Sequence, residues 1–443
     1  MKTEYTCAIC LKDFSSKAQY ERHNKRKRPC KASKTVKQIL QENPIVETIR
    51  DAEGSFRQNS LEMNKKIKRE TRKANGIFFT PKKARDLVFD VLNKCGVNPE
   101  YILEPSFGSG EFLSDMKLRY PLSKITGVEL NETLYKSFKP LENIELVHQD
   151  FLTYTSSKLF DLIIGNPPYF LIKEKNSNCM VGRPNIYVAF LYKCLEQHLK
   201  ENGYLAFVLP TSLFNCSYYE PMRKYIYKNC TIKYVKELDV KYYQTEQDTM
   251  LLVLQKKIDP SHRFIFERSG NIYISPQSEE LTELVKNTKT LDELGFDVKT
   301  GEVVWNQEKD KLVEEGGVPL IYNTNITNCE LTLNNLKDTK KEKKQYIKGF
   351  HKKPISQPAI LVNRGYGNVF AFNFVYVNNM TFFAENHINM ILARTKEAEA
   401  MFPQIVESLK NSLTKKFVEC FVGNGAISAS ELHKILPIFL LDH

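Results

Sequence analysis

The feature that most constrains the fold is a series of short apolar segments between Gly76 and Lys257, alternating with amphipathic helical patterns. Three of them, residues 101–103, 125–128 and 144–147, end at or shortly before an acidic residue. Short apolar strands that alternate with helices are typical of an α/β protein built on a parallel sheet. We therefore expect their carboxyl ends to meet at one edge of the sheet, where such folds bind ligands.

A turn containing Gly108 and Gly110 follows the first expected strand. Glycines at a strand-to-helix turn let a ligand approach the backbone closely, although the third glycine of a dinucleotide fingerprint is missing. Glu129, 21 residues after Gly108, ends the second strand and could accept both ribose hydroxyls of a nucleoside. Asp150 and Phe151 follow the third strand, where they could accept from an adenine amino group and stack on its ring.

The fourth expected strand runs into Asn166, Pro167, Pro168 and Tyr169. This tetrapeptide resembles the NPPY motif of the amino-methyltransferases, and the preceding segments resemble that family's S-adenosylmethionine (SAM) site. The resemblance implies a Rossmann-like SAM-dependent methyltransferase domain of the α/β class. It also implies the residues that bind SAM, namely Thr80, Glu104, Gly108, Gly110, Glu129, Asp150, Phe151 and Asn166. Alternatively, Thr80 only caps the amphipathic helix that follows it.

An exocyclic amine is a weak nucleophile because its lone pair is delocalised into the ring. The chemistry of the motif follows from this weakness. Accepting both of its hydrogens, through the Asn166 side-chain oxygen and the Pro167 carbonyl, would aim the lone pair at the methyl sulfonium. The prolines stiffen the turn, and Tyr169 offers a face for the target base. Tyr242, with Tyr243 in reserve, resembles the family residue that stacks on the other face. Holding the methyl donor and the target amine in line is mainly proximity catalysis, and it needs no catalytic metal.

The order of the motifs indicates a subclass and a substrate. Only 58 positions separate Gly108 from Asn166, so a sequence-reading domain must lie C-terminal to them. This order resembles the gamma class of DNA amino-methyltransferases from restriction–modification systems, and NPPY in that class points to adenine N6 rather than cytosine N4. We therefore expect base flipping of an adenine from duplex DNA. A C-terminal α+β target-recognition domain would contact the DNA backbone through Lys337, Lys340, Lys341, Lys343, Lys344, Lys348, Lys352, Lys353 and Arg364.

The first thirty residues carry a potential zinc site formed by Cys7, Cys10, His23 and Cys30. Thiolates and an imidazole suit a tetrahedral structural Zn²⁺. The segment resembles a small ββα C2H2 zinc finger, except that its last ligand is Cys and follows a six-residue spacer. Whether such a finger reads bases, docks a protein or is purely structural stays open.

Charge supports a nucleic-acid partner, because residues 1–75 carry 19 Lys and Arg against 9 Asp and Glu, most of the whole chain's net +12. The expected domains are a finger at 1–31, a basic linker at 32–75, a catalytic domain at 76–257 and a recognition domain at 258–443. A polar N-terminus and the lack of a long apolar run predict an intracellular protein of a reducing compartment with no membrane partner. The domain combination suggests a eukaryote or one of its large DNA viruses.

Two rival functions remain at this level. One is an RNA or protein-glutamine amino-methyltransferase that uses the same motif, and the other is a DNA-binding regulator without catalytic activity. A cognate restriction endonuclease would be a further partner of a restriction–modification methylase.

Overall fold

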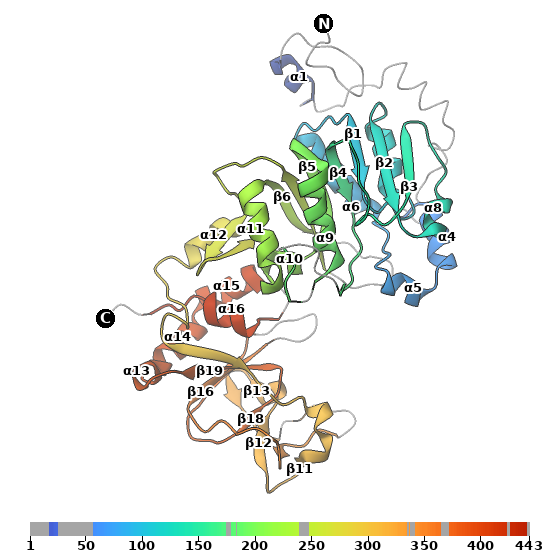
Figure 1. Ribbon diagram of the computed structural model, residues 1–443. Coiled ribbons are helices and arrows are strands. Elements are labelled where there is room, and N and C mark those ends of the chain that lie inside the picture. The colour runs from blue at the N-terminus through green and yellow to red at the C-terminus, as the bar shows by residue number, and fades with distance from the viewer. Residues whose placement is uncertain are drawn as a thin grey trace. The chain divides into compact units, whose positions relative to one another are not determined.

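The computed structural model describes residues 17–24, 56–173, 179–182, 184–238, 248–334, 336, 342–364, 372–422 and 426–440. They form two compact units (Figure 1). The first contains the described residues up to Ile265 together with 272–276, and the second contains 266–271 and the described residues from Gln277 onward.

The first unit is built on a seven-stranded sheet in the order β3-β2-β1-β4-β5-β7-β6. The strands are β1 (Tyr101–Glu104), β2 (Lys124–Glu129), β3 (Ile144–His148), β4 (Phe160–Gly165), β5 (Leu199–Pro210), β6 (Thr231–Leu238) and β7 (Thr249–Gln255). Strands β1 to β5 run parallel, whereas β7 is antiparallel to both β5 and β6.

The Rossmann-like α/β prediction is confirmed, with two corrections. The sheet is mixed, and β6 was not expected. Residues 239–248 alone join β6 to β7, which is too short for a parallel crossover.

Helices cover both faces of this sheet (Figure 1), and the period-two alternation of the strands supplies a core to each. In β4, for example, Leu162 and Ile164 join the core beneath α6 and α7, whereas Ile163 joins the core beneath α9 and α11. The helices are α6 (Lys82–Lys94), α7 (Glu111–Arg119), α8 (Glu132–Ser137), α9 (Ile186–Lys193), α10 (Ser212–Asn215) and α11 (Glu220–Asn229).

The described part of the expected linker, from residue 56 to 75, is packed structure rather than a free connection. It forms α4 (Gln58–Lys66) and α5 (Arg69–Ala74). Apolar side chains from α4 and its flanks, including Phe56, Met63 and Ile67, pack with Phe79 and Leu134 of the first unit. The high charge of this segment predicted a linker, although its apolar residues have the spacing of one face of a helix. Further upstream, α1 (Lys17–Asn24) is also helical.

The second unit contains two four-stranded sheets, a short hairpin and a group of helices. The first sheet is antiparallel and orders β10 (Phe296–Thr300), β19 (Ile388–Ala393), β16 (Ala359–Asn363) and β17 (Phe374–Val377). The second orders β11 (Leu312–Val313), β15 (Tyr346–Ile347), β12 (Val318–Ile321) and β18 (Phe383–Ala384). The hairpin pairs β13 (Ile326–Thr327) with β14 (Glu330–Leu331). The helices are α12 (Ser278–Leu284), α13 (Lys396–Glu399), α14 (Phe402–Lys410), α15 (Ser412–Val422) and α16 (Ala429–Lys434).

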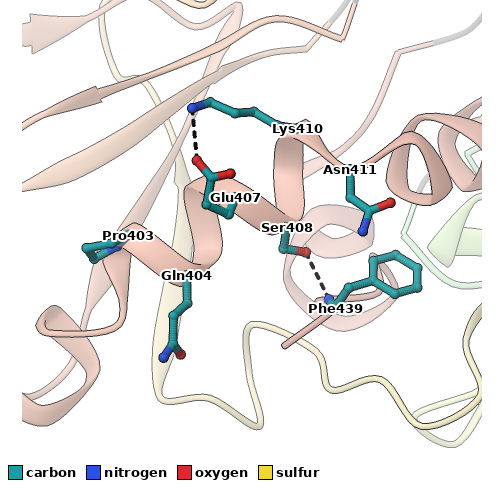
Figure 2. A pocket seen from close by; sticks show the side chains of 7 residues that line it. All are labelled: Pro403, Gln404, Glu407, Ser408, Lys410, Asn411 and Phe439. Atoms are coloured by element: carbon teal, nitrogen blue, oxygen red, sulfur yellow. Dashed lines mark hydrogen bonds and ion pairs between the residues drawn. The ribbon is translucent and has the colours of Figure 1, made fainter. Parts of the chain in front are cut away.

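A hollow of about 420 Å³ lies along α14 of the second unit and is open to solvent. Figure 2 shows the Glu407 carboxylate turned toward the Lys410 ammonium, at 3.0 Å, and the Ser408 hydroxyl turned toward the Phe439 backbone N–H, at 2.9 Å. These polar groups satisfy one another, and none of the residues singled out by the sequence lines the hollow. Within the described part of the chain, no helix is both long and apolar enough to cross a membrane.

Helix α9 ends at Lys193 and continues as a single π-helical turn, Cys194–His198, before β5 begins at Leu199. The His198 ring is buried beside Phe151, Tyr154 and Phe160. Burial, with a smaller contribution from the Lys193 charge, lowers the pKa of His198 to about 4. The native state therefore keeps this imidazole neutral.

Because the pKa of His198 is lower in the native than in the unfolded protein, the unfolded state takes up the proton first as the pH falls from about 6.5 toward 4. We expect His198 to reduce the free energy of unfolding by at most about 2 kcal/mol between pH 7.5 and pH 5. Urea unfolding of the wild type and His198→Leu at both pH values measures this difference. The variant should lose less stability on acidification, whereas His351→Leu, at an exposed histidine, should behave as the wild type does. Equal losses in all three proteins would contradict the assignment.

Candidate functional site

The parallel strands bring the predicted polar residues to one edge of the sheet. Strand β1 pairs with both β2 and β4, so the chain order reverses between β1 and β4. Ligands of open α/β sheets bind at the carboxyl ends of the strands beside such a reversal. Glu104 ends β1, and Asn166 directly follows β4, so these two residues flank the reversal. Glu129 ends the neighbouring β2.

The turn after β1 has the backbone that its glycines predict. Gly108 and Gly110 have φ angles of 56° and 83°, in the left-handed region that side chains disfavour. A Cβ on Gly110 would lie only 2.0 Å from a ring carbon of Phe138, whereas a Cβ on Gly108 would meet no atom within 4 Å. Gly110 is therefore required by packing, and Gly108 leaves open space above the backbone.

Glu129 holds this turn from the side of β2. Its carboxylate accepts from the Gly108 backbone N–H at 2.8 Å and from the Asn131 N–H at 2.7 Å. Burial raises the pKa of Glu129, and these backbone hydrogen bonds oppose the rise. Leu130, which the sequence analysis missed, is 64% exposed beside this carboxylate. The sequence signal available was an apolar residue directly after a strand-ending acid, and the exposure of that residue is known only from the structure.

Glu104 is the most unusual group at this edge. Its side chain is 2% exposed, and its Oε2 atom has no hydrogen-bond partner among the described residues. Burial, followed by the charges of Glu129, Asp115 and Glu111, raises the pKa of Glu104 well above its usual range. A buried carboxyl group surrounded by other acids suits a cationic ligand, and an ammonium group such as that of SAM fits this position.

Asp150 and Phe151 follow β3 but have different surroundings. Asp150 accepts from the Leu152 backbone N–H at 2.9 Å and stays half-buried. Phe151 is only 2% exposed, and its ring centroid lies 4.8 Å from that of Phe190, within the core that contains His198. Phe151 thus forms part of the packed floor beneath this strand end rather than a freely standing aromatic face.

The side chain of Asn166 is oriented by three neighbours. Its Nδ2 donates to the Thr80 hydroxyl at 3.1 Å and to the Phe78 carbonyl at 3.4 Å, while its Oδ1 accepts from the Tyr169 hydroxyl. The same Tyr169 hydroxyl also lies 2.7 Å from the Val208 carbonyl of β5. The Phe78 carbonyl can only accept, so it favours Nδ2 on that side and leaves Oδ1 toward the Tyr169 hydroxyl, whose single hydrogen is shared with the Val208 carbonyl.

Thr80 does not cap the following helix, so that alternative is wrong. Helix α6 begins at Lys82 with Pro81 as its N-cap, and the Thr80 side chain accepts from Asn166 instead. Thr80 is 3% exposed, and its carbonyl accepts from Arg85 at 2.5 Å. In the tetrapeptide, Pro167 is buried and Pro168 is half-buried. The ring of Tyr169 packs edge-on against that of Tyr187 at 5.9 Å.

Several predicted residues lie outside the described residues. These are Tyr242, Tyr243, Cys7, Cys10 and Cys30, together with Lys337, Lys340 and Lys341 of the expected DNA-backbone contacts. His23 lies in α1, although only its backbone is described. Among the described residues, no cluster of three or more Cys, His, Asp or Glu side chains has the arrangement of a metal site.

Comparison with known proteins gives one family match and several relatives. Residues 107–243 match the Eco57I restriction-modification methylase family. The type II methyltransferase M.CvrRI of Paramecium bursaria Chlorella virus XZ-6E is 31% identical over 395 residues, covering 87% of this chain and 99% of the relative. Modification methylase CviBIII of Paramecium bursaria Chlorella virus NC1A is 30% identical over 405 residues, with coverage of 87% and 99%. The tRNA1(Val) (adenine(37)-N6)-methyltransferase of Glaesserella parasuis is 32% identical over 123 residues, covering 26% of this chain and 52% of that enzyme.

Burial and neighbouring acids raise the pKa of Glu104 above its value in the unfolded protein. At neutral pH this group therefore lowers the free energy of unfolding of the ligand-free protein, and this destabilisation becomes smaller as the pH falls toward 4.5. We expect Glu104→Gln to raise the melting temperature at pH 7.5 by about 2–4 °C, the effect of about 1 kcal/mol in a unit of this size. The gain should be smaller at pH 5. Differential scanning calorimetry without ligand measures it, with the exposed Glu100→Gln as a control that should change nothing. A variant less stable than the wild type at pH 7.5 would contradict the expectation.

Proposed function

This chain belongs to the SAM-dependent type II methyltransferases of restriction–modification systems, and from that premise we propose that it methylates the N6 amino group of adenine at specific sites in duplex DNA. The observation that carries the proposal is the fixed carboxamide of Asn166. Its Nδ2 is engaged by Thr80 and Phe78, so its Oδ1 is the atom available to an incoming amine.

The reaction needs an amine that is made nucleophilic and aligned. The Asn166 Oδ1 would accept one amino hydrogen and the Pro167 carbonyl the other, which favours a tetrahedral nitrogen with its lone pair directed outward. The hydrogen bond that Oδ1 already accepts from Tyr169 leaves one oxygen lone pair for the substrate. Alignment of this kind lowers the barrier mainly by avoiding the entropy loss of a bimolecular encounter.

Bound SAM would supply an electrophilic methyl group. Glu104 would hold its ammonium group, because the carboxyl is buried and its Oε2 has no hydrogen-bond partner among the residues that the structure describes. Glu129 would accept from the ribose hydroxyls beside the Gly108 and Gly110 turn. Asp150 would accept from the adenine amino group, with Leu130 and Phe151 forming the apolar part of that pocket.

Adenine is the proposed base because the motif begins with Asn, and because a relative with a similar segment is a tRNA adenine-N6 methyltransferase. The target base would leave the duplex and lie between Tyr169 and Tyr242. The second unit would recognise the site. In support, the Lys343 ammonium lies 5.0 Å from the ring of Trp305, which is half-buried, and this combination of charge and aromatic surface suits nucleic acid. The Tyr322 ring, 4.9 Å from the same ammonium, is buried beneath it.

We further propose that Cys7, Cys10, His23 and Cys30 bind a structural Zn²⁺, and the helical backbone of α1 around His23 supports a ββα finger there. The two viral relatives support a large DNA virus of a eukaryote as the source. A cognate restriction endonuclease fits the family but has no support in this chain.

The deciding experiment is methyl transfer from labelled SAM to unmethylated duplex DNA, single-stranded DNA, RNA and a release-factor protein, followed by nucleoside mass spectrometry. We expect N6-methyladenine in duplex DNA. Asn166→Ala should lower the rate at least a hundredfold while SAM still binds, and Asn229→Ala, at an exposed asparagine of α11, should leave it unchanged.

Other outcomes of this experiment favour the rival functions. Label only in RNA or protein would overturn the DNA proposal, and SAM binding without any transfer would favour a regulator. A near-normal rate in Asn166→Ala would contradict the mechanism, whatever the substrate.

Thr80 has a contact that separates positioning of Asn166 from binding of SAM. Thr80→Val removes the hydroxyl that accepts from Asn166 while keeping the shape of the side chain. We expect kcat to fall about tenfold, the loss of one buried hydrogen bond, with little change in KM for SAM. Steady-state kinetics with saturating DNA measure both constants. A higher KM for SAM at unchanged kcat would show instead that Thr80 acts only on the cofactor.

A further inference from the structure

Helix α4, within the segment expected to be a linker, contacts the glycine turn of the SAM site directly. The Asn59 side-chain amide donates to the Ser109 carbonyl at 2.8 Å and to the Ser137 hydroxyl at 3.2 Å. The Ser60 hydroxyl lies 2.6 Å from the Ser109 hydroxyl. Ser109 is the residue between Gly108 and Gly110, and it is 4% exposed. Helix α4 therefore contacts both the carbonyl and the hydroxyl of Ser109.

A cluster of buried charges anchors α4 at its N-terminal end. The Arg57 guanidinium pairs with Asp115, and its Nε lies 3.5 Å from the Glu111 carboxylate. Arg85 of α6 approaches the same two acids, at 2.6 Å for Glu111 and 2.7 Å for Asp115. The Ser60 hydroxyl also donates to Glu111. Two arginines thus balance two acids, in a cluster where all four side chains are mostly buried.

The glycine turn is consequently held from two sides. Glu129 of β2 holds the Gly108 N–H, and α4 holds Ser109. A turn with two left-handed glycines has many accessible conformations, and ordering it when a ligand binds would reduce affinity. Contacts that order it beforehand increase affinity without touching the ligand.

We propose that α4 is a built-in part of the SAM site, and that Asn59 and Ser60 are positioning residues that hold the turn from Gly108 to Gly110 in its cofactor-binding conformation. The inference rests on the SAM dependence of the family, and it is independent of which base or polymer receives the methyl group. The region of 32–75 that the structure describes is then a functional element rather than a connection to the N-terminal arm.

The test compares Ser60→Ala and Asn59→Ala with Gln58→Ala in the full-length chain. Gln58 lies on the exposed side of the same helix and pairs only with Glu62 in the described contacts, so it reports any general loss of helix α4. Isothermal titration with SAM and with S-adenosylhomocysteine gives the affinities, and steady-state methyl transfer gives kcat and both KM values.

We expect Ser60→Ala and Asn59→Ala each to raise the Kd for SAM about three- to tenfold, the range for the one hydrogen bond to Ser109 that each variant loses. The second bond that each loses, to Glu111 or to Ser137, lies outside the turn from Gly108 to Gly110. At saturating SAM, kcat and the KM for DNA should stay within about twofold of the wild type, since the hydrogen bonds of both residues go to the glycine turn and its neighbours rather than to Asn166 or Tyr169. Gln58→Ala should match the wild type throughout. Because Ser60 acts through Ser109, the double variant Ser60→Ala/Ser109→Ala should bind SAM no more weakly than the weaker single variant.

Unchanged SAM affinity in both Ser60→Ala and Asn59→Ala would overturn the inference, even if their melting temperatures fell. Fully additive losses in the double variant would overturn the route through Ser109. A wild type that binds SAM but methylates no DNA would refute the proposed substrate and leave this inference standing, so the two failures are distinguishable.

Discussion

The parallel pairing of β1 with both β2 and β4 is the constraint on which the rest of the site depends. It brings Glu104, Glu129 and Asn166, which lie far apart in the chain, to one edge of a single sheet. A carboxyl group, a glycine turn and a carboxamide then face the same side of the fold. Every proposed step uses this edge, because it would hold the methyl donor and the amine at fixed places relative to one another.

Electrostatics at this edge oppose stability and favour ligand binding. Glu104 is buried, has one oxygen without a hydrogen-bond partner in the described part of the chain, and has acids for neighbours. Burial, followed by the charges of these acids, raises its pKa in the ligand-free protein. Glu111 and Asp115, which lie nearby, have ion-pair partners in Arg57 and Arg85, although burial still raises the pKa of Glu111. The difference between paired and unpaired acids distinguishes the groups that support the scaffold from the group that is available to a cation.

Much of the site could be predicted because its signals are local. Each signal spans only a few neighbouring residues: the strand ends, the glycine turn and the Asn-Pro-Pro-Tyr segment. The Rossmann-like sheet that these signals predicted is confirmed. The mixed direction of the sheet was missed because strand β6 buries only Ile232, Val235 and Leu238, and this spacing of three residues lacks the period-two alternation of a strand. Phe151 illustrates a second limit, since an aromatic residue at a strand end looks the same in sequence whether it stands open or joins the core.

The sequence by itself determined the order of strands and turns, the identity of the polar residues at the strand ends and the chemistry of the amine-binding motif. Only the tertiary structure decided how these groups are oriented and supported. Asn166 is oriented by Thr80, 86 positions away, and Ser109 is held by Asn59, 50 positions away. Such contacts leave no periodic trace in the chain, because a hydroxyl or an amide is equally compatible with solvent, a helix cap or a distant partner. The folded sheet and the docked α4 select among these alternatives, and burial makes each chosen hydrogen bond costly to lose.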